Sequence, residues 1–89
     1  MVRLFVRHKV SNYEGWRKVY DDFDAKRRSM GVKADAVYRS VDDTNDVTVT
    51  HDFDSADKAH ALIASPELRE AMGNAHVEGI PEMWVTNDA

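Results

Sequence analysis

Histidines and a run of aromatic residues are the side chains of this sequence best suited to chemistry. His8 and His51 each fall on the apolar side of a segment with a two-residue hydrophobic period. A neutral imidazole near its ordinary pKa accepts a proton from a phenol or from an acidic carbon. We therefore take His8 and His51 as candidate general bases. Hydrogen-bonded core histidines are the alternative interpretation of the same pattern.

Three aromatic residues share one face of the first predicted helix. Tyr13, Trp16 and Tyr20 recur at intervals of three and four residues, the spacing of a helical stripe. Ordinary core packing explains such a stripe, yet two tyrosine hydroxyl groups need partners when they are buried. A small-molecule site typically combines apolar walls with a few polar groups. The stripe therefore indicates either a packed core or a cavity that holds a ligand.

Several other kinds of site lack their sequence patterns. The chain has no cysteine, so thiolate metal sites and cysteine nucleophiles are excluded. No two histidines, His60 and His76 included, have the helical spacing of a metal pair. The acidic run from Asp42 to Asp46 lacks the glycine and glutamate of a calcium loop, and we interpret it as a solvated turn. We expect no metal and no cofactor.

Length and charge restrict the protein further. With 89 residues, the chain is expected to form a single domain over residues 1–89. A net charge of −4 disfavours a nucleic-acid partner. Neither a signal peptide nor a membrane span is visible, so a soluble cytoplasmic protein is the default expectation. Ten of the twelve basic residues lie in residues 1–40, and we expect them to pair with the acidic remainder.

The first half of the chain reads as a strand, a helix and a hairpin. Alternating residues predict a strand over 2–10, and Ser11 with Glu14 forms a capping box that starts a helix ending at Gly31. Two further strands, over 33–41 and 47–53, flank the acidic turn.

The second half predicts a broken helix and a last strand. Ser55 caps a helix that runs to Ile63, and Ser65 with Pro66 restarts it. A loop over 75–81 then leads to a strand over 82–86. The order is βαββαβ, an α+β ferredoxin-like fold, and right-handed crossovers place its four-stranded antiparallel sheet in the order 4-1-3-2. Both helical regions lie on one face, so a second copy of the sheet is the natural cover for the other.

These segments resemble the dimeric α/β-barrel superfamily, in particular its small proteins similar to antibiotic-biosynthesis monooxygenases. The resemblance spans nearly the whole chain. It is carried by Val6-Arg7-His8-Lys9-Val10 with Tyr13 and Trp16, by Tyr38-Arg39, by Phe53-Asp54-Ser55, and by Ser65-Pro66-Glu67-Leu68 with Met72, Gly79 and Pro81.

The resemblance implies a homodimer formed through the sheet faces, with a small-molecule ligand between the helices and the sheet of each subunit. It adds Met72 to the pocket candidates and places His76 at the pocket rim. The trio of Asn, Trp and His residues found in the haem-degrading members of the superfamily has no match in this sequence. The implied function is binding of a small aromatic or polyketide-like compound, with cofactor-independent oxygenation or cyclisation. The alternative is a non-catalytic ligand-binding or stress-related dimeric module.

Overall fold

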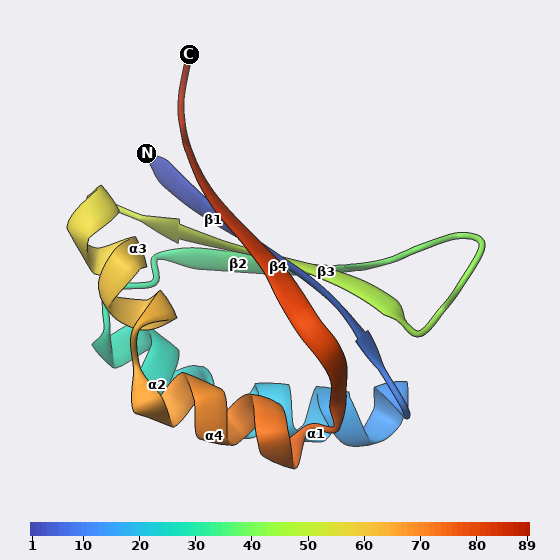
Figure 1. Cartoon of the computed structure of the whole chain (residues 1–89). Coiled ribbons are helices and arrows are strands. Elements are labelled where there is room, and N and C mark those ends of the chain that lie inside the picture. The colour runs from blue at the N-terminus through green and yellow to red at the C-terminus, as the bar shows by residue number, and fades with distance from the viewer.

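The computed structural model describes all 89 residues. The four strands form one antiparallel sheet in the order β2-β3-β1-β4, which confirms the expected ferredoxin-like fold. All helices cover one face of this sheet, and no element of the chain lies over the other face (Figure 1). None of the helices has the length and apolarity needed to span a membrane. The elements are β1 (Val2–Val10), α1 (Tyr13–Asp22), α2 (Asp24–Ser29), β2 (Ala34–Arg39), β3 (Asp46–Phe53), α3 (Ala56–Ile63), α4 (Pro66–Asn74) and β4 (Val77–Asn87).

Side-chain caps start three of the four helices. The Asn12 side chain accepts a hydrogen bond from the Gly15 amide at 3.1 Å, so the cap of α1 is Asn12 and not Ser11 as the sequence predicted. Asparagine caps a helix as well as serine does, and here it stands one residue closer to the first turn. Ser55 and Ser65 cap α3 and α4, which confirms both predicted helix starts.

The first predicted helix is divided in two at Phe23. Phe23 keeps a right-handed conformation (φ −84°, ψ −3°), and its amide donates to the carbonyl oxygens of Val19 and Tyr20. The Arg27 guanidinium donates to the same Tyr20 oxygen at 2.6 Å. The helical region still ends as predicted, because Gly31 has a φ of +102° that other residues rarely adopt.

The last strand is longer than the sequence predicted. The loop expected over residues 75–81 belongs largely to β4. The β1–β4 register shifts between Arg7 and Lys9, and this irregularity accommodates Gly79 and Pro81. Because β4 is an edge strand, a proline within it costs no hydrogen bond to a neighbour, so these residues do not end the strand.

One end of the expected acidic turn belongs to the sheet. Asp46 begins β3 and is buried, and its carboxylate accepts two hydrogen bonds from Arg7 at 2.7 and 3.1 Å. The interpretation as a solvated turn is therefore wrong for Asp46, because a bidentate guanidinium replaces the water that it loses. The expected pairing of the two halves is confirmed. Four more ion pairs between side chains join them: Arg3–Asp52, Lys9–Asp43, Lys26–Glu67 and Lys33–Asp54.

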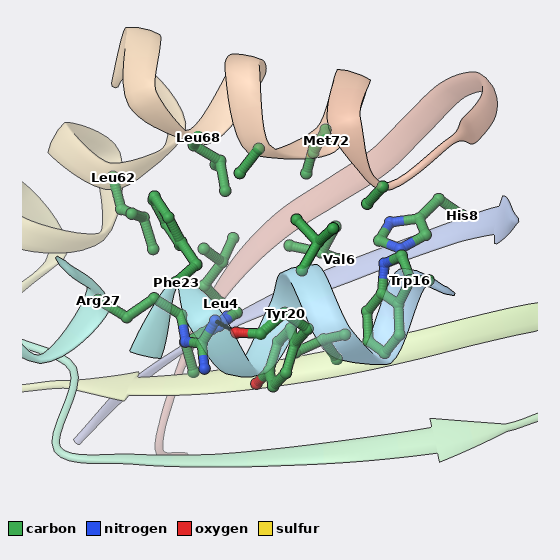
Figure 2. Close-up of a pocket in the computed structure, with 15 residues that line it drawn as sticks. Leu4, Val6, His8, Trp16, Tyr20, Phe23, Arg27, Leu62, Leu68 and Met72 are labelled. Atoms are coloured by element: carbon green, nitrogen blue, oxygen red, sulfur yellow. Dashed lines mark hydrogen bonds between the residues drawn. The ribbon is translucent and has the colours of Figure 1, made fainter. Parts of the chain in front are cut away.

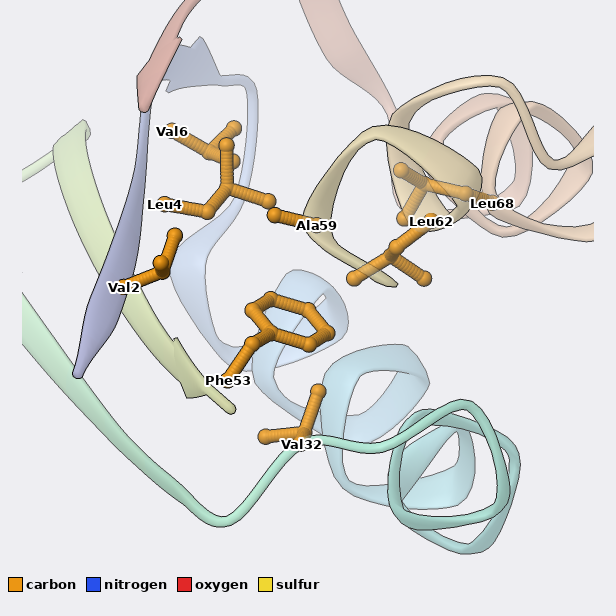
Figure 3. Packing of buried hydrophobic residues seen from close by; sticks show 8 residues of the cluster. All are labelled: Val2, Leu4, Val6, Val32, Phe53, Ala59, Leu62 and Leu68. Atoms are coloured by element: carbon orange, nitrogen blue, oxygen red, sulfur yellow. The ribbon is translucent and has the colours of Figure 1, made fainter. Parts of the chain in front are cut away.

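The core lies between the helices and the sheet. Leu4, Phe53 and Leu62 are fully buried in one cluster, where side chains of β1 and β3 meet those of α3 (Figure 3). A second cluster surrounds Trp16 and Val47 nearer the other end of the sheet. The strand period thus brings every second side chain of β1 and β3 to the helices, and His8 and His51 are among them.

Candidate functional site

A cavity of ≈ 50 Å³ lies between the helices and the sheet. Figure 2 shows side chains from the sheet and the helices turned toward the same space. Most of its lining is apolar, which is typical of small-molecule sites. The volume holds only a few water molecules, so a larger ligand requires a wall to move. The lining residues are Leu4, Val6, His8, Trp16, Val19, Tyr20, Phe23, Arg27, Val49, His51, Leu62, Leu68, Ala71, Met72 and Ala75.

His8 lies near the end of β1 beside an aromatic wall. Its ring centroid is 5.7 Å from that of Trp16, and the residue is only 7% exposed. Neither ring nitrogen of His8 has a hydrogen-bond partner in the protein. Burial lowers the pKa of His8 to about 4, although the Asp46 carboxylate opposes the shift. His8 is therefore neutral at neutral pH and presents one donor and one acceptor.

His51 on β3 has a different environment. Its ring centroid is 6.3 Å from that of Tyr20, and the residue is 5% exposed with both ring nitrogens unpaired. Burial lowers the pKa of His51 to about 4, and the positive charges of Arg27 and Arg28 add to the effect. Burying an unpaired polar group costs about 1–3 kcal/mol, which makes such an imidazole a strong candidate for ligand contact.

The strand register separates the two histidines. His8 pairs with Val47 across β1 and β3, whereas His51 pairs with Leu4. The four-residue offset corresponds to about 13 Å along the strand. This confirms that the two imidazoles are out of register. A single proton or metal ion therefore cannot bridge the two imidazoles.

Arg27 is a site residue that the sequence analysis missed. Although arginine is usually exposed, this one is 2% exposed and lines the cavity. Its Cζ atom lies 3.7 Å above the Tyr20 ring, and its Nη2 atom donates to Asp24 at 3.1 Å. Its Nε atom is buried without a partner. The spacing Tyr20, Phe23, Arg27 continues the apolar helical stripe, and this was the signal that could have revealed it.

A hydrogen-bonded pair fixes the Tyr20 ring. The Tyr20 hydroxyl group donates to the Asp35 carboxylate at 2.5 Å. Burial and this hydrogen bond together raise the pKa of Tyr20. Burial also disfavours ionised Asp35, but the Tyr20 hydrogen bond and the charges of Arg27 and Arg28 outweigh it and lower the pKa of Asp35. Tyr20 thus stays protonated and cannot serve as a base at neutral pH.

The structure brings five of the seven predicted site residues together. His8, Trp16, Tyr20, His51 and Met72 line the cavity. Two lie outside the lining. Tyr13 packs against Trp16, and the Arg39 Cζ atom lies 3.7 Å from the Tyr13 ring centroid. His76 is exposed and joins α4 to β4 with a φ of +56°.

A surface groove of ≈ 370 Å³ adjoins the cavity between α1 and α4. Val19, Phe23 and Ala71 line both spaces, so these three side chains separate the groove from the cavity and make the groove a candidate entrance. The other four groove residues are polar: Asp22, Glu67, Glu70 and Asn74. The first three of them are acidic.

Comparison with known proteins shows the fold. No family model matches the sequence, and a search of curated proteins gave no match. SnoaB, a cofactor-independent oxygenase from Streptomyces nogalater, is 14% identical with a TM-score of 0.80, and the match covers 99% of this chain and 92% of that chain. An antibiotic biosynthesis monooxygenase is 13% identical with a TM-score of 0.72, covering 100% and 99% of the two chains.

A third structure has no activity in its description. A conserved protein from Methanosarcina mazei Go1 is 11% identical with a TM-score of 0.80, and the match covers 99% of this chain and 92% of that chain. At such identities, these likenesses establish a shared fold and leave the chemistry to the site. They confirm, for the fold, the resemblance to the antibiotic-biosynthesis monooxygenases.

Proposed function

We propose that this chain binds a small aromatic or polyketide-like compound in the cavity and catalyses a cofactor-independent oxygenation or cyclisation. The observation that carries the proposal is the pair of buried imidazoles, His8 and His51, whose ring nitrogens have no protein partner beside an apolar cavity. The fold shared with SnoaB, which is described as a cofactor-independent oxygenase, adds support. The reaction begins with proton removal from the bound compound.

His51 is the better placed of the two candidate bases. With a pKa lowered to about 4 by burial, the imidazole is weakly basic but fully deprotonated at neutral pH. A substrate anion formed beside it would stabilise the imidazolium and raise its pKa. Arg27, which also lines the cavity, would share the anion's charge. His8 lacks such a cation and is better suited to hydrogen-bond a neutral oxygen of the substrate.

The substrate itself can supply the electrons for oxygenation. Removal of a proton from an activated carbon leaves an electron pair on the substrate. Attack of this carbanion on O₂ followed by protonation gives a hydroperoxide, and loss of water leaves a carbonyl group. The electron pair of the first C–H bond reduces O₂ to the hydroperoxide. As water leaves, the second C–H bond of the same carbon breaks and its electron pair forms the carbonyl bond, so the steps balance without a cofactor. Cyclisation uses the same carbanion to attack a carbonyl carbon within the molecule.

The remaining lining residues would position the ring system. Trp16 offers a flat wall, stacked on Tyr20 with ring centroids 4.9 Å apart. Met72 on α4 is half-buried and flexible, so its movement is the easiest way to enlarge the cavity. Tyr13 would act on a ligand only through Trp16, because it does not line the cavity. His76 lines neither the cavity nor the groove, so we assign it no contact with the ligand.

The uncovered sheet face supports assembly as a homodimer. Phe5 and Trp84 stack there with ring centroids 5.2 Å apart, and Trp84 is 42% exposed. Tyr38, on β2, is also exposed. Aromatic residues gathered on one exposed sheet are typical of protein interfaces. A second copy of the same face would bury them symmetrically.

Native mass spectrometry of freshly purified protein tests assembly and ligand together. A dimer that carries a defined organic mass is expected. Once that compound is identified, turnover by His8→Ala and His51→Ala variants is compared with turnover by His60→Ala, a control on the exposed side of α3. Loss of a general base slows turnover by about 10²–10⁴-fold. Wild-type turnover by both cavity variants would refute the base role.

A non-catalytic binding module is the second candidate function. The weak basicity of both histidines and the small cavity favour it. This candidate predicts that the co-purifying compound is recovered chemically unchanged after prolonged incubation with the protein and O₂. Its binding would still depend on the histidines. Detection of an oxygenated or cyclised product would exclude it.

A further inference from the structure

The cavity and its entrance carry opposite charges. Inside, Arg27 is buried with its Nε atom unpartnered. At the entrance, the groove between α1 and α4 presents Asp22, Glu67 and Glu70. The Cζ atom of Arg27 lies 6.0 Å from the ring centroid of Phe23, which lines both spaces. A ligand that passes the carboxylates and reaches Phe23 is therefore separated from the buried cation by little more than the Phe23 ring.

We infer that the cavity takes weak acids that arrive uncharged, because the acidic groove slows anions at the entrance while Arg27 stabilises the anion formed inside. The inference rests on the proposed function, since it assumes that the cavity binds a small molecule. It adds to the proposed function the charge that the ligand carries in the groove and in the cavity. Phenols and enols satisfy both conditions, whereas carboxylates, which are already ionised in neutral solution, do not.

The entrance acts on the rate of association. Two of its carboxylates, Asp22 and Glu70, form no ion pair within the protein, so their charges are uncompensated by a neighbour. Glu67 is paired with Lys26 only at 3.8 Å. Charges that line a cleft change the approach of an ionic ligand and leave a neutral one unaffected. Salt screens this effect, so raising the ionic strength should specifically speed up anions.

The interior acts on the ionisation equilibrium. When a phenol binds, its O–H bond breaks, the proton passes to a ring nitrogen of His51, and the electron pair remains on oxygen. The product is an imidazolium beside a phenolate, so charge is conserved. Arg27 favours the phenolate in this low-dielectric space. The charged or titratable groups around Arg27 are Asp24 and Arg28 on its own helix, Tyr20 on α1, Asp35 on β2 and His51 on β3.

The interior is tested with para-nitrophenol, whose anion is yellow and whose neutral form is nearly colourless. The probe is buffered below its own pKa, and the protein is added in excess. Yellow colour is expected to appear on binding to the wild type and to fall by at least about tenfold with Arg27→Met. Arg27→Lys should restore part of it. Arg69→Met, at an exposed arginine of α4 outside the lining, is the control and should keep the colour.

The entrance is tested by stopped-flow quenching of Trp16 fluorescence in a Trp84→Phe background. Para-nitrobenzoate and para-nitrobenzamide differ mainly in charge. The benzoate should associate more slowly, and the Asp22→Asn/Glu70→Gln variant should speed it up about two- to tenfold while leaving the benzamide unchanged. Asp42→Asn/Glu78→Gln removes two exposed carboxylates elsewhere and should change neither rate.

The outcomes separate the inference from the proposed function. If para-nitrophenol binds without colour, or if the wild type takes up the benzoate as fast as the benzamide, the inference is wrong while the binding cavity remains. If none of the three probes binds, the proposed function fails as well. Because the entrance variants change surface residues only, that arm remains decisive even if Arg27→Met prevents folding.

Discussion

Acidification should destabilise this fold through its two cavity histidines. Burial lowers the pKa of His8 and His51 to about 4, whereas an unfolded histidine has a pKa of about 6.5. Between these values the unfolded chain binds protons that the folded chain does not bind. The free energy of unfolding therefore falls as the pH decreases from about 6.5 to about 4. Above that window His8 and His51 are neutral in both the folded and the unfolded state, and the effect disappears.

The size of the effect follows from the two pKa values. Integrating the linkage relation from about pH 7 to about pH 5 gives a loss of about 2 kcal/mol for each histidine, and about 4 kcal/mol for both. That loss is a large fraction of the 5–15 kcal/mol by which a typical domain is stable. The calculation stops at about pH 5 because aspartates of the unfolded chain begin to take up protons below that pH. They include the two aspartates that form ion pairs with Arg3 and Arg7 in the folded protein.

Urea denaturation at several pH values between about 7 and 5 measures this slope. His8→Leu and His51→Leu should each remove about half of it, and the double variant should remove nearly all. His60→Leu, on the exposed side of α3, is the control and should retain the full slope. A wild-type free energy of unfolding that stays constant across this range, or a slope unchanged in the double variant, would refute the assignment of two buried, neutral imidazoles.

Three further predictions concern the fold and the assembly. Gly31→Ala should destabilise by about 1–2 kcal/mol because of its positive φ, whereas Gly73→Ala, which meets open space in α4, should not; thermal unfolding compares the two. Asp46→Asn should lower the melting temperature more than Asp43→Asn, whose carboxylate is more exposed, and equal shifts would contradict the buried pair. Trp84→Glu on the open sheet should convert a dimer to a monomer in light scattering, and an unchanged mass would exclude this face as the interface.

Much of the fold could be predicted from the sequence because its signals are local. The two-residue period of β1 and β3 and the caps at Ser55 and Ser65 depend on residues only a few positions apart. The βαββαβ order then left few possible topologies. The errors occurred where a local signal was outweighed. Gly79 and Pro81 indicate a loop by themselves, but an edge strand with a bulge tolerates them.

The candidate site was only partly accessible to sequence reasoning. The alternation of residues placed His8 and His51 on the buried face, and helical spacing placed Trp16 and Tyr20 beside them. Arg27 was missed because a charged residue in a helix normally faces water. The cation–π contact with Tyr20, the hydrogen bond to its carbonyl oxygen and the ion pair with Asp24 make its burial tolerable.

The sequence by itself determined the elements, their order and the faces that they bury. Tertiary structure decided which buried polar groups find partners, because partners come from elements far apart in the chain. Tyr20 on α1 is satisfied by Asp35 on β2, and Arg7 on β1 satisfies Asp46 on β3. His51 meets no such partner. That difference depends on the packing of helices against the sheet, and it distinguishes the candidate site from the surrounding core.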